Sequence, residues 1–272
     1  MTVIFEVARQ RLDGAGNCWH HPLMRNFATF IFAGIAASTF AQGPVAAPGF
    51  QAPKEVAPGV FEIGAIRLDR NTSTVTFPTK VNMTDGLIEY TIVTSKGPTH
   101  ESLLVSDVSP QNVHMAMLLL GAKGMSIGKN APPPERIDAE YLAKAPKLEG
   151  DQIFITCKWK EADGKEKSVP LERWLIRREE VARKKPKEIP AEDGAWLYTG
   201  SFLHEGRFNA DVQGVFGAVV TSPGALINNP RKGANDDHMW FAKTDAMPEP
   251  GTPVETSIKL EPAKNKETQP KK

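Results

Sequence analysis

The chain's clearest structural signal is the run Ile153-Phe154-Ile155-Thr156-Cys157-Lys158-Trp159. Its odd-numbered positions hold two isoleucines, a cysteine and a tryptophan, whereas a threonine and a lysine stand among the even-numbered ones. Because successive side chains of a strand point to opposite faces of a sheet, this two-residue period predicts a half-buried β-strand. The following stretch, Glu161 to Lys165, predicts a hairpin turn, since Gly164 can take the positive φ that such turns require.

Strands are predicted along most of the remaining sequence. Residues Leu87 to Val93 repeat the period of two. Other short segments are rich in β-branched and aromatic residues, which favour strands: Phe61 to Leu68, Thr74 to Val81, Leu103 to Val105, Trp196 to Phe202, Val215 to Thr221 and Val254 to Leu260. The charged stretch from Arg177 to Glu188 has helix-forming residues but no apolar stripe, and we interpret it as a solvated excursion.

One helix is predicted from Pro110 to Leu120. Ser109 suits the cap position, proline fits the first helical position, apolar residues recur at helical spacing, and Gly121 suits the end. A second, shorter helix is predicted from Asp138 to Ala143, between proline-containing flanks. The fold class predicted from these elements is α+β and β-rich: a mixed or antiparallel sheet system with one or two packed helices.

The amino-terminal residues predict export. The apolar run from Phe27 to Ala37 is shorter than the roughly 20 residues of a bilayer-spanning helix, and small residues that suit signal peptidase follow it up to Ala41. We expect residues 1–41 to contain a signal peptide that is cut after Ala41 and directs the protein to the periplasm or the extracellular space. Translation beginning at Met24 would supply a positive n-region, and a long leader beginning at Met1 is the alternative.

The remaining chain divides into three segments by composition. Residues 42–58 are rich in Pro, Ala and Gly and predict a linker; residues 59–261 form one domain; residues 262–272 lack apolar side chains apart from one Ala and predict a disordered tail. Beyond residue 41 the basic and acidic side chains are equal in number and interspersed, so we expect no nucleic-acid partner. The same part of the chain has no apolar run long enough to span a membrane.

Several separated segments carry a family resemblance, and they agree with it in order: Ile66-Arg67-Leu68-Asp69, Val75-Thr76-Phe77-Pro78, Gly86-Leu87-Ile88-Glu89-Tyr90, His100-Glu101-Ser102-Leu103-Leu104, residues 114–122, Thr199-Gly200-Ser201, residues 225–230, Asp236-Asp237 and residues 250–254. Over nearly all of residues 60–260 the chain resembles the YdjY-like domain family of bacterial exported proteins. The resemblance implies one domain in an exported protein, and it implies no activity and no catalytic residues. Some relatives carry ferredoxin-like labels, but a cluster generally needs four protein ligands and only Cys157 lies beyond residue 41, so no iron–sulfur cluster is expected.

Histidine and carboxylate neighbours suggest a metal site. His100 adjoins Glu101, and His204 adjoins Glu205. Imidazole and carboxylate are ligands that a divalent metal such as zinc recruits, so these four residues are candidate ligands. Adjacent strand residues point to opposite faces, so each pair would reach one ion only where a loop or bulge turns a side chain. The alternative is that these histidines hydrogen-bond the backbone at the margin of the sheet.

No complete catalytic motif appears in the sequence. The Gly-x-Ser-x-Gly nucleophile elbow and the His-Glu-x-x-His zinc motif are both missing. Cys157 lies on the predicted strand, which favours a buried, inert thiol. We therefore expect a noncatalytic binding or accessory protein, whose partner is an envelope protein or a small ligand. The alternatives are a metal-dependent enzyme or metal-handling protein that uses the two His-Glu pairs, and a purely structural envelope component.

Overall fold

The protein is built around a closed β-barrel. The computed structural model describes residues 51–124, 148–182 and 185–261. Within them one large sheet closes on itself as an eight-stranded barrel, and two α-helices accompany it, of which only α1 exceeds seven residues. The predicted α+β class is therefore wrong, although the expectation of a β-rich domain is confirmed. Local periodicity identifies strands, but it does not show that the two edges of their sheet meet.

Hydrogen bonds join the barrel strands in a ring. Their order is β4 (Thr74–Val81), β17 (Pro253–Leu260), β7 (Asp151–Lys160), β11 (Trp196–Tyr198), β15 (Ile227–Asn228), β14 (Val215–Ala218), β5 (Tyr90–Thr94) and β6 (Ser102–Ser106). Strand β6 pairs back onto β4, with Lys80 opposite Val105 and Val81 opposite Leu104, and so closes the ring. The pairs β14–β15 and β5–β6 are parallel, and the other pairs of the ring are antiparallel.

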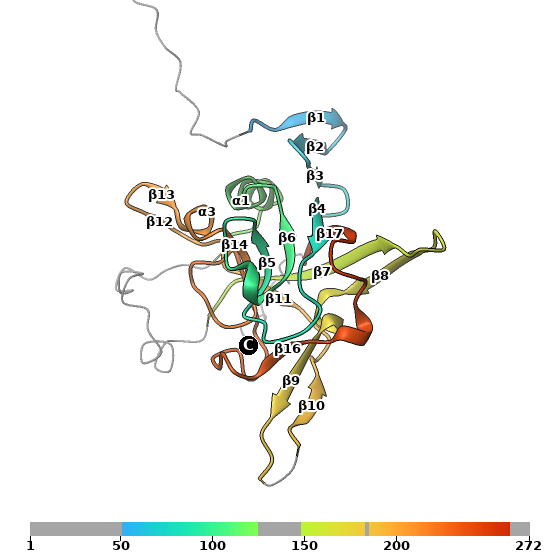
Figure 1. Ribbon diagram of the computed structural model, residues 1–272. Coiled ribbons are helices and arrows are strands. Elements are labelled where there is room, and N and C mark those ends of the chain that lie inside the picture. Colours follow the sequence, from blue (N-terminus) through green and yellow to red (C-terminus); the bar gives the residue numbers. More distant parts are fainter. Residues whose placement is uncertain (1–50, 125–147, 183–184, 262–272) are drawn as a thin grey trace, which may run out of the picture. The chain divides into compact units, whose positions relative to one another are not determined.

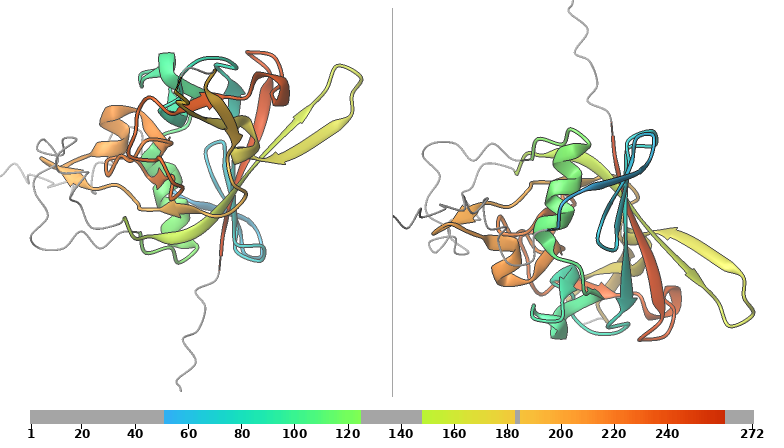
Figure 2. Two further views of the ribbon diagram at one scale, coloured as in Figure 1. Left: turned by 90° about the horizontal axis from the view of Figure 1, so that it is seen from below. Right: turned by 90° about the horizontal axis from the view of Figure 1, so that it is seen from above.

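Further strands extend from the barrel. A meander of β1 (Lys54–Ala57), β2 (Val60–Ile63) and β3 (Ile66–Asp69) continues the sheet beyond β4, and β8 (Glu166–Pro170) pairs with β7. A three-stranded sheet contains β10 (Lys187–Pro190), β9 (Leu175–Glu179) and β16 (Trp240–Ala242), and a small hairpin contains β12 (Leu203–His204) and β13 (Arg207–Phe208). The hairpins β7–β8 and β9–β10 project away from the barrel (Figures 1 and 2).

The strand predicted from the opening run is confirmed as part of β7. Ile153, Ile155, Cys157 and Trp159 are all buried, and the residues between them are not. The central strand β17 has the same alternation and pairs with both β4 and β7, so that Ile258 lies opposite Val75 on one side and opposite Ile155 on the other. The alternating apolar faces of these three strands therefore supply much of the barrel core.

Other predicted strands differ in their bounds. The prediction for residues 74–81 matches β4, whereas the segment from Phe61 to Leu68 is divided into β2 and β3 by a turn containing Gly64. Strands β11 and β14 end earlier than predicted. Strand β5 begins at Tyr90, and its three central residues are all buried, because the strand is covered on both faces. The charged stretch from Arg177 to Glu188 contributes to β9 and β10.

The predicted helix is confirmed as α1 (Pro110–Leu119), with Ser109 at its N-cap position. The Ser109 hydroxyl does not cap the helix; it donates a hydrogen bond to Asp211 instead. Asp211 belongs to the short helix α3 (Asn209–Gln213), and its Oδ1 atom accepts a hydrogen bond from the Gln111 backbone N–H at 3.1 Å. Helix α1 packs on β3, β4 and α3. The carboxylate of Asp211 therefore fixes α3 against the start of α1.

Two buried polar features support the core. The Cys157 thiol is fully buried and its pKa is raised, mainly by burial, which agrees with the prediction of an inert thiol. Glu172, in the 3-10 turn η3 (Leu171–Trp174), accepts hydrogen bonds from the Gly194 N–H and from the Trp196 indole. Arg231 lies 3.6 Å from this carboxylate and stacks over the Trp196 ring. This buried pair connects η3 to the two loops that precede β11 and follow β15.

Several predictions lie outside the described residues. They are the signal peptide, residues 42–50 of the linker, the helix from Asp138 to Ala143 and the carboxy-terminal tail. The last linker residues are described, and Lys54–Ala57 form the exposed strand β1. In the described part of the chain no helix is long and apolar enough to cross a membrane.

Candidate functional site

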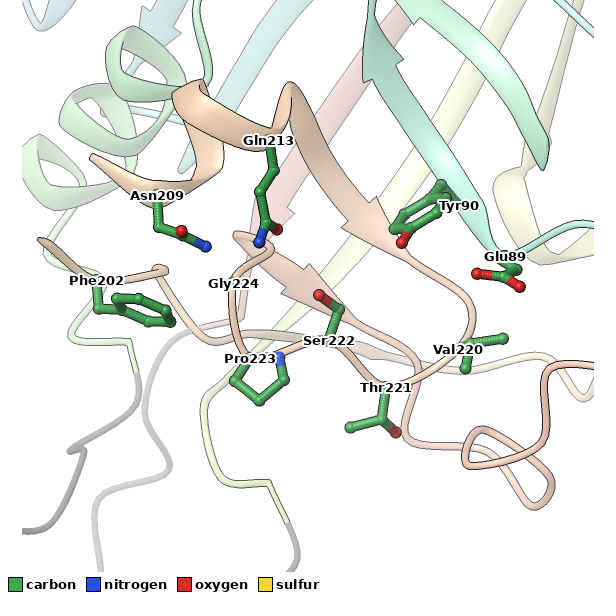
Figure 3. A pocket seen from close by; sticks show the side chains of 10 residues that line it. All are labelled: Glu89, Tyr90, Phe202, Asn209, Gln213, Val220, Thr221, Ser222, Pro223 and Gly224. Atoms are coloured by element: carbon green, nitrogen blue, oxygen red, sulfur yellow. The ribbon is translucent and has the colours of Figure 1, made fainter. Parts of the chain in front are cut away.

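A polar cleft lies beside the barrel, where the end of β14 meets the start of β5. Its volume is about 200 Å³, below the roughly 300–1,000 Å³ typical of sites for drug-sized ligands. Figure 3 shows α3 on one side of the cleft, the loop after β14 below it, and the start of β5 at its far end. The lining residues are Glu89, Tyr90, Phe202, Asn209, Gln213, Val220, Thr221, Ser222, Pro223 and Gly224.

The floor of the cleft is residues 219–224, which we call the floor loop. Asn228 is fully buried and holds Ser222 at both backbone groups: its Oδ1 accepts from the Ser222 N–H at 2.7 Å and its Nδ2 donates to the Ser222 carbonyl at 2.9 Å. Asn229 donates to the Val219 carbonyl at 3.1 Å. Ser201, whose φ of 57° is rare for a serine, donates to the Gly224 carbonyl. The floor loop is therefore preorganised.

Helix α3 supplies two side-chain amides to the cleft. Gln213 and Asn209 both point toward Gly224 of the floor loop (Figure 3). Asn209 is only 8 % exposed, and its Nδ2 atom is buried without a hydrogen-bond partner. A buried donor without a partner costs about 1–3 kcal/mol, so nearly all such groups in folded proteins are satisfied. This amide is therefore a donor to which a ligand in the cleft could supply the acceptor.

The far end of the cleft is acidic. The pKa of the Glu89 carboxyl is raised, mainly by burial. The negative charge of Glu101, a hydrogen bond with Glu101 and the charge of Asp237 raise this pKa further, whereas His100 lowers it. Burial also raises the pKa of the Tyr90 phenol, with smaller effects of the same two glutamates. The Tyr90 hydroxyl is thus protonated at neutral pH and offers both a donor and an acceptor to the cleft.

The four candidate metal ligands lie in two separate elements. His100 and Glu101 belong to the 3-10 turn η1 (Thr99–Glu101), which brings His100 Nε2 within 2.8 Å of Glu101 Oε1. His204 ends β12, and Glu205 stands in the following turn with a φ of 47°. Among the described residues no three histidine, cysteine or acidic side chains are grouped as metal ligands would be, so the two pairs do not form one cluster. A metal site on these residues stays a prediction.

The other two histidines among the described residues, His114 and His238, do not line the cleft. His114 is packed between α1 and the core, where its Nδ1 atom lies 2.6 Å from the Tyr198 hydroxyl, and burial lowers its pKa. His238 is exposed beside Asp237. Sequence reasoning did not identify Asn209 and Gln213, because their five-residue helix is too short to show a period. The one local signal for it is Gly214, which ends the helix at a positive φ of 68°.

The fold and the cleft together define a class of protein: a β-barrel domain with a small polar site on its outer surface. The chain belongs to the YdjY family, because the family model of the YdjY domain matches residues 66–259. That range runs from β3 through β17, so the match includes every strand of the barrel and every residue of the cleft. The resemblance inferred from the sequence is thereby confirmed. A search of curated proteins and a search of solved structures each gave no match.

Replacement of Asn209 tests whether its amide lacks a partner in the free protein. We expect Asn209→Leu to raise the free energy of unfolding by about 1 kcal/mol, because it removes a desolvated donor that makes no hydrogen bond. The melting temperature should rise by roughly 2–4 °C. The control is Asn228→Leu, which breaks three hydrogen bonds to Ser222 and Thr199 and should cost at least about 2 kcal/mol. Equal losses in both variants would contradict this view of Asn209.

Replacement of Glu89 should change the pH dependence of stability. A carboxyl whose pKa is raised by folding contributes stability below its ordinary pKa of about 4.3, and this contribution is lost as the pH rises through the raised value. Glutamine resembles the protonated form. Glu89→Gln should therefore be more stable than the wild type at neutral pH, and the difference should vanish near pH 4.3, as measured by urea denaturation across this range. Glu62→Gln, on the exposed part of β2, controls for the loss of one charge. A difference that does not vary with pH would argue against the prediction.

Proposed function

We propose that the protein is an exported, noncatalytic binding protein that holds a small polar ligand in the cleft between α3, the floor loop and the start of β5. The observation that carries this proposal is the buried Asn209 amide, which lines the cleft and has a donor without a partner. A preformed cavity with a few convergent polar groups is the usual form of a small-molecule site. The bonds from Asn228 and Asn229 favour binding, because a loop that is already ordered loses little entropy when a ligand arrives.

The side chains of the cleft support binding better than catalysis. The ten lining residues include one serine and no histidine, lysine or cysteine, so they contain no Ser–His or Cys–His pair. Glu101, the carboxyl that acts on Glu89 most strongly, raises the Glu89 pKa and does not itself belong to the lining of the cleft. The cleft offers amide, hydroxyl and carboxyl groups that orient a ligand.

Ligand screening tests the binding function. We expect saturation-transfer NMR with a set of anionic, cationic and uncharged molecules below drug size to detect binders to the wild type. Gly224→Ala should abolish their binding, because its Cβ atom would lie 2.3 Å from Asn209 Nδ2 and 2.8 Å from Gln213 Oε1 and would displace both amides. Gln213→Ala should weaken binding, and Gln152→Ala, an exposed glutamine on β7, is its matched control. Binders that are unaffected by both cleft variants would refute the cleft as the site.

Export rests on the apolar run and the small residues that follow it, and a reporter fusion tests it. Residues 1–41 joined to an alkaline phosphatase that lacks its own leader should give phosphatase activity outside the cytoplasm of a bacterial host. Sequencing of the exported fusion should show cleavage after Ala41. Lysine in place of Ile31 and Ile35 should block export, because charge interrupts the apolar core of the leader. Retention of the unmodified fusion in the cytoplasm would disprove the export assignment.

A further inference from the structure

The charges around the cleft restrict the class of ligand. None of the ten lining residues is a lysine, arginine or histidine. The carboxyl groups of Glu101 and Asp237 act on Glu89 at the far end of the cleft. His100, which has the opposite effect on the Glu89 pKa, is three-quarters exposed and already paired with Glu101. An anionic ligand would enter a negative field without a counter-charge, which disfavours phosphates and carboxylates.

The hydrogen-bonding groups of the cleft require both donors and acceptors from the ligand. Asn209 Nδ2 needs an acceptor, whereas the Glu89 carboxyl group offers oxygen atoms that accept. Between them Gln213, Tyr90 and Ser222 each combine a donor with an acceptor. A molecule that carries several hydroxyl groups meets this requirement at every position, because each hydroxyl both donates and accepts.

Aromatic surface is also present in the cleft. The half-buried Phe202 lies at the α3 end of the floor loop, and the Tyr90 ring lies toward the opposite end (Figure 3). A pyranose ring presents hydroxyl groups at its rim and C–H groups on its faces, and an aromatic side chain contacts such a face favourably. The small volume of the cleft, about 200 Å³, suits a single ring better than a drug-sized molecule.

From these observations we infer that the cleft binds a polyhydroxylated molecule of monosaccharide size that carries no negative charge. This inference rests on the binding function proposed above, and it specifies the chemical class of the ligand. Asn209 donates to a hydroxyl or ring oxygen of the ligand, the Glu89 end accepts from its hydroxyl groups, and Phe202 contacts its C–H face.

A series of sugars that differ in charge tests this inference. Isothermal titration of the full chain with glucose, galactose, mannose and N-acetylglucosamine should detect binding of at least one uncharged sugar. Glucuronate should bind at least about tenfold more weakly than glucose. Glucosamine with its amine protonated should bind at least as tightly as glucose, because the negative field of the cleft favours a cation. Asn209→Leu should weaken binding of the uncharged sugar by about tenfold, the loss expected for one buried hydrogen bond, and Gln152→Ala should leave it unchanged.

The outcomes separate the ligand class from the binding function. Tighter binding of glucuronate than of the uncharged sugars would overturn the ligand class, and weaker binding of glucosamine than of glucose would refute the negative field from which that class is argued. A second outcome would also overturn the ligand class: no sugar binds, but molecules of another class bind to the wild type and not to Gly224→Ala. The proposed binding function would then stand. Failure of every molecule in both experiments would overturn the two proposals together.

Discussion

Barrel closure depends on one strand, β6, which pairs with β4 on one side and with β5 on the other. Without the β4–β6 pairing, the backbone N–H and C=O groups on the facing sides of these two strands would lack partners. The pairing supplies hydrogen bonds to both strands. The pairing also gives the apolar faces of β4, β17 and β7 a common interior, in which Phe77 stacks on Phe216 of β14 across the ring. The core thus depends on contacts between residues that lie more than a hundred positions apart.

The same closure positions the cleft. Strand β5 is held between β6 and β14, with Tyr90 opposite Ser102 on one side and opposite Ala218 on the other. The Glu89 carbonyl accepts from the N–H groups of Val219 and Val220, so the start of β5 fixes the beginning of the floor loop. Helix α3 is tied separately to α1 through Asp211. The cleft therefore combines a wall fixed by the barrel with a wall fixed by the helices.

The sequence predicted those elements whose own residues determine their structure. Strand β7 buries every second residue, and helix α1 buries Val113, Ala116 and Met117 at helical spacing, so the periods of both elements appear directly in the sequence. Closure was not predictable, because no local pattern states that Val81 lies opposite Leu104. Strand β5 is buried on both faces, so its burial does not alternate and its predicted bounds were shifted.

The site was less predictable than the fold, for a different physical reason. Histidine and carboxylate neighbours suggest metal ligation by their chemistry, yet a site requires convergence in space, and the topology places His100 and His204 in different elements. For Asn209 the sequence gives only the end of its helix, at Gly214. The importance of the Asn209 amide follows from its burial without a partner.

The unpaired amide of Asn209 indicates a role in binding, because it does not contribute to stability. Burying this amide without a hydrogen bond costs desolvation free energy, which an apolar residue of similar size would not cost. Stability alone therefore does not favour asparagine at this position. The neighbouring Asn228 and Asn229 show that this fold satisfies buried amides where they serve the structure. Thr91 Oγ1 and Trp174 Nε1 are also buried without a hydrogen-bond partner, but Asn209 differs from them because it lines a cleft. There the missing partner can be supplied by a ligand.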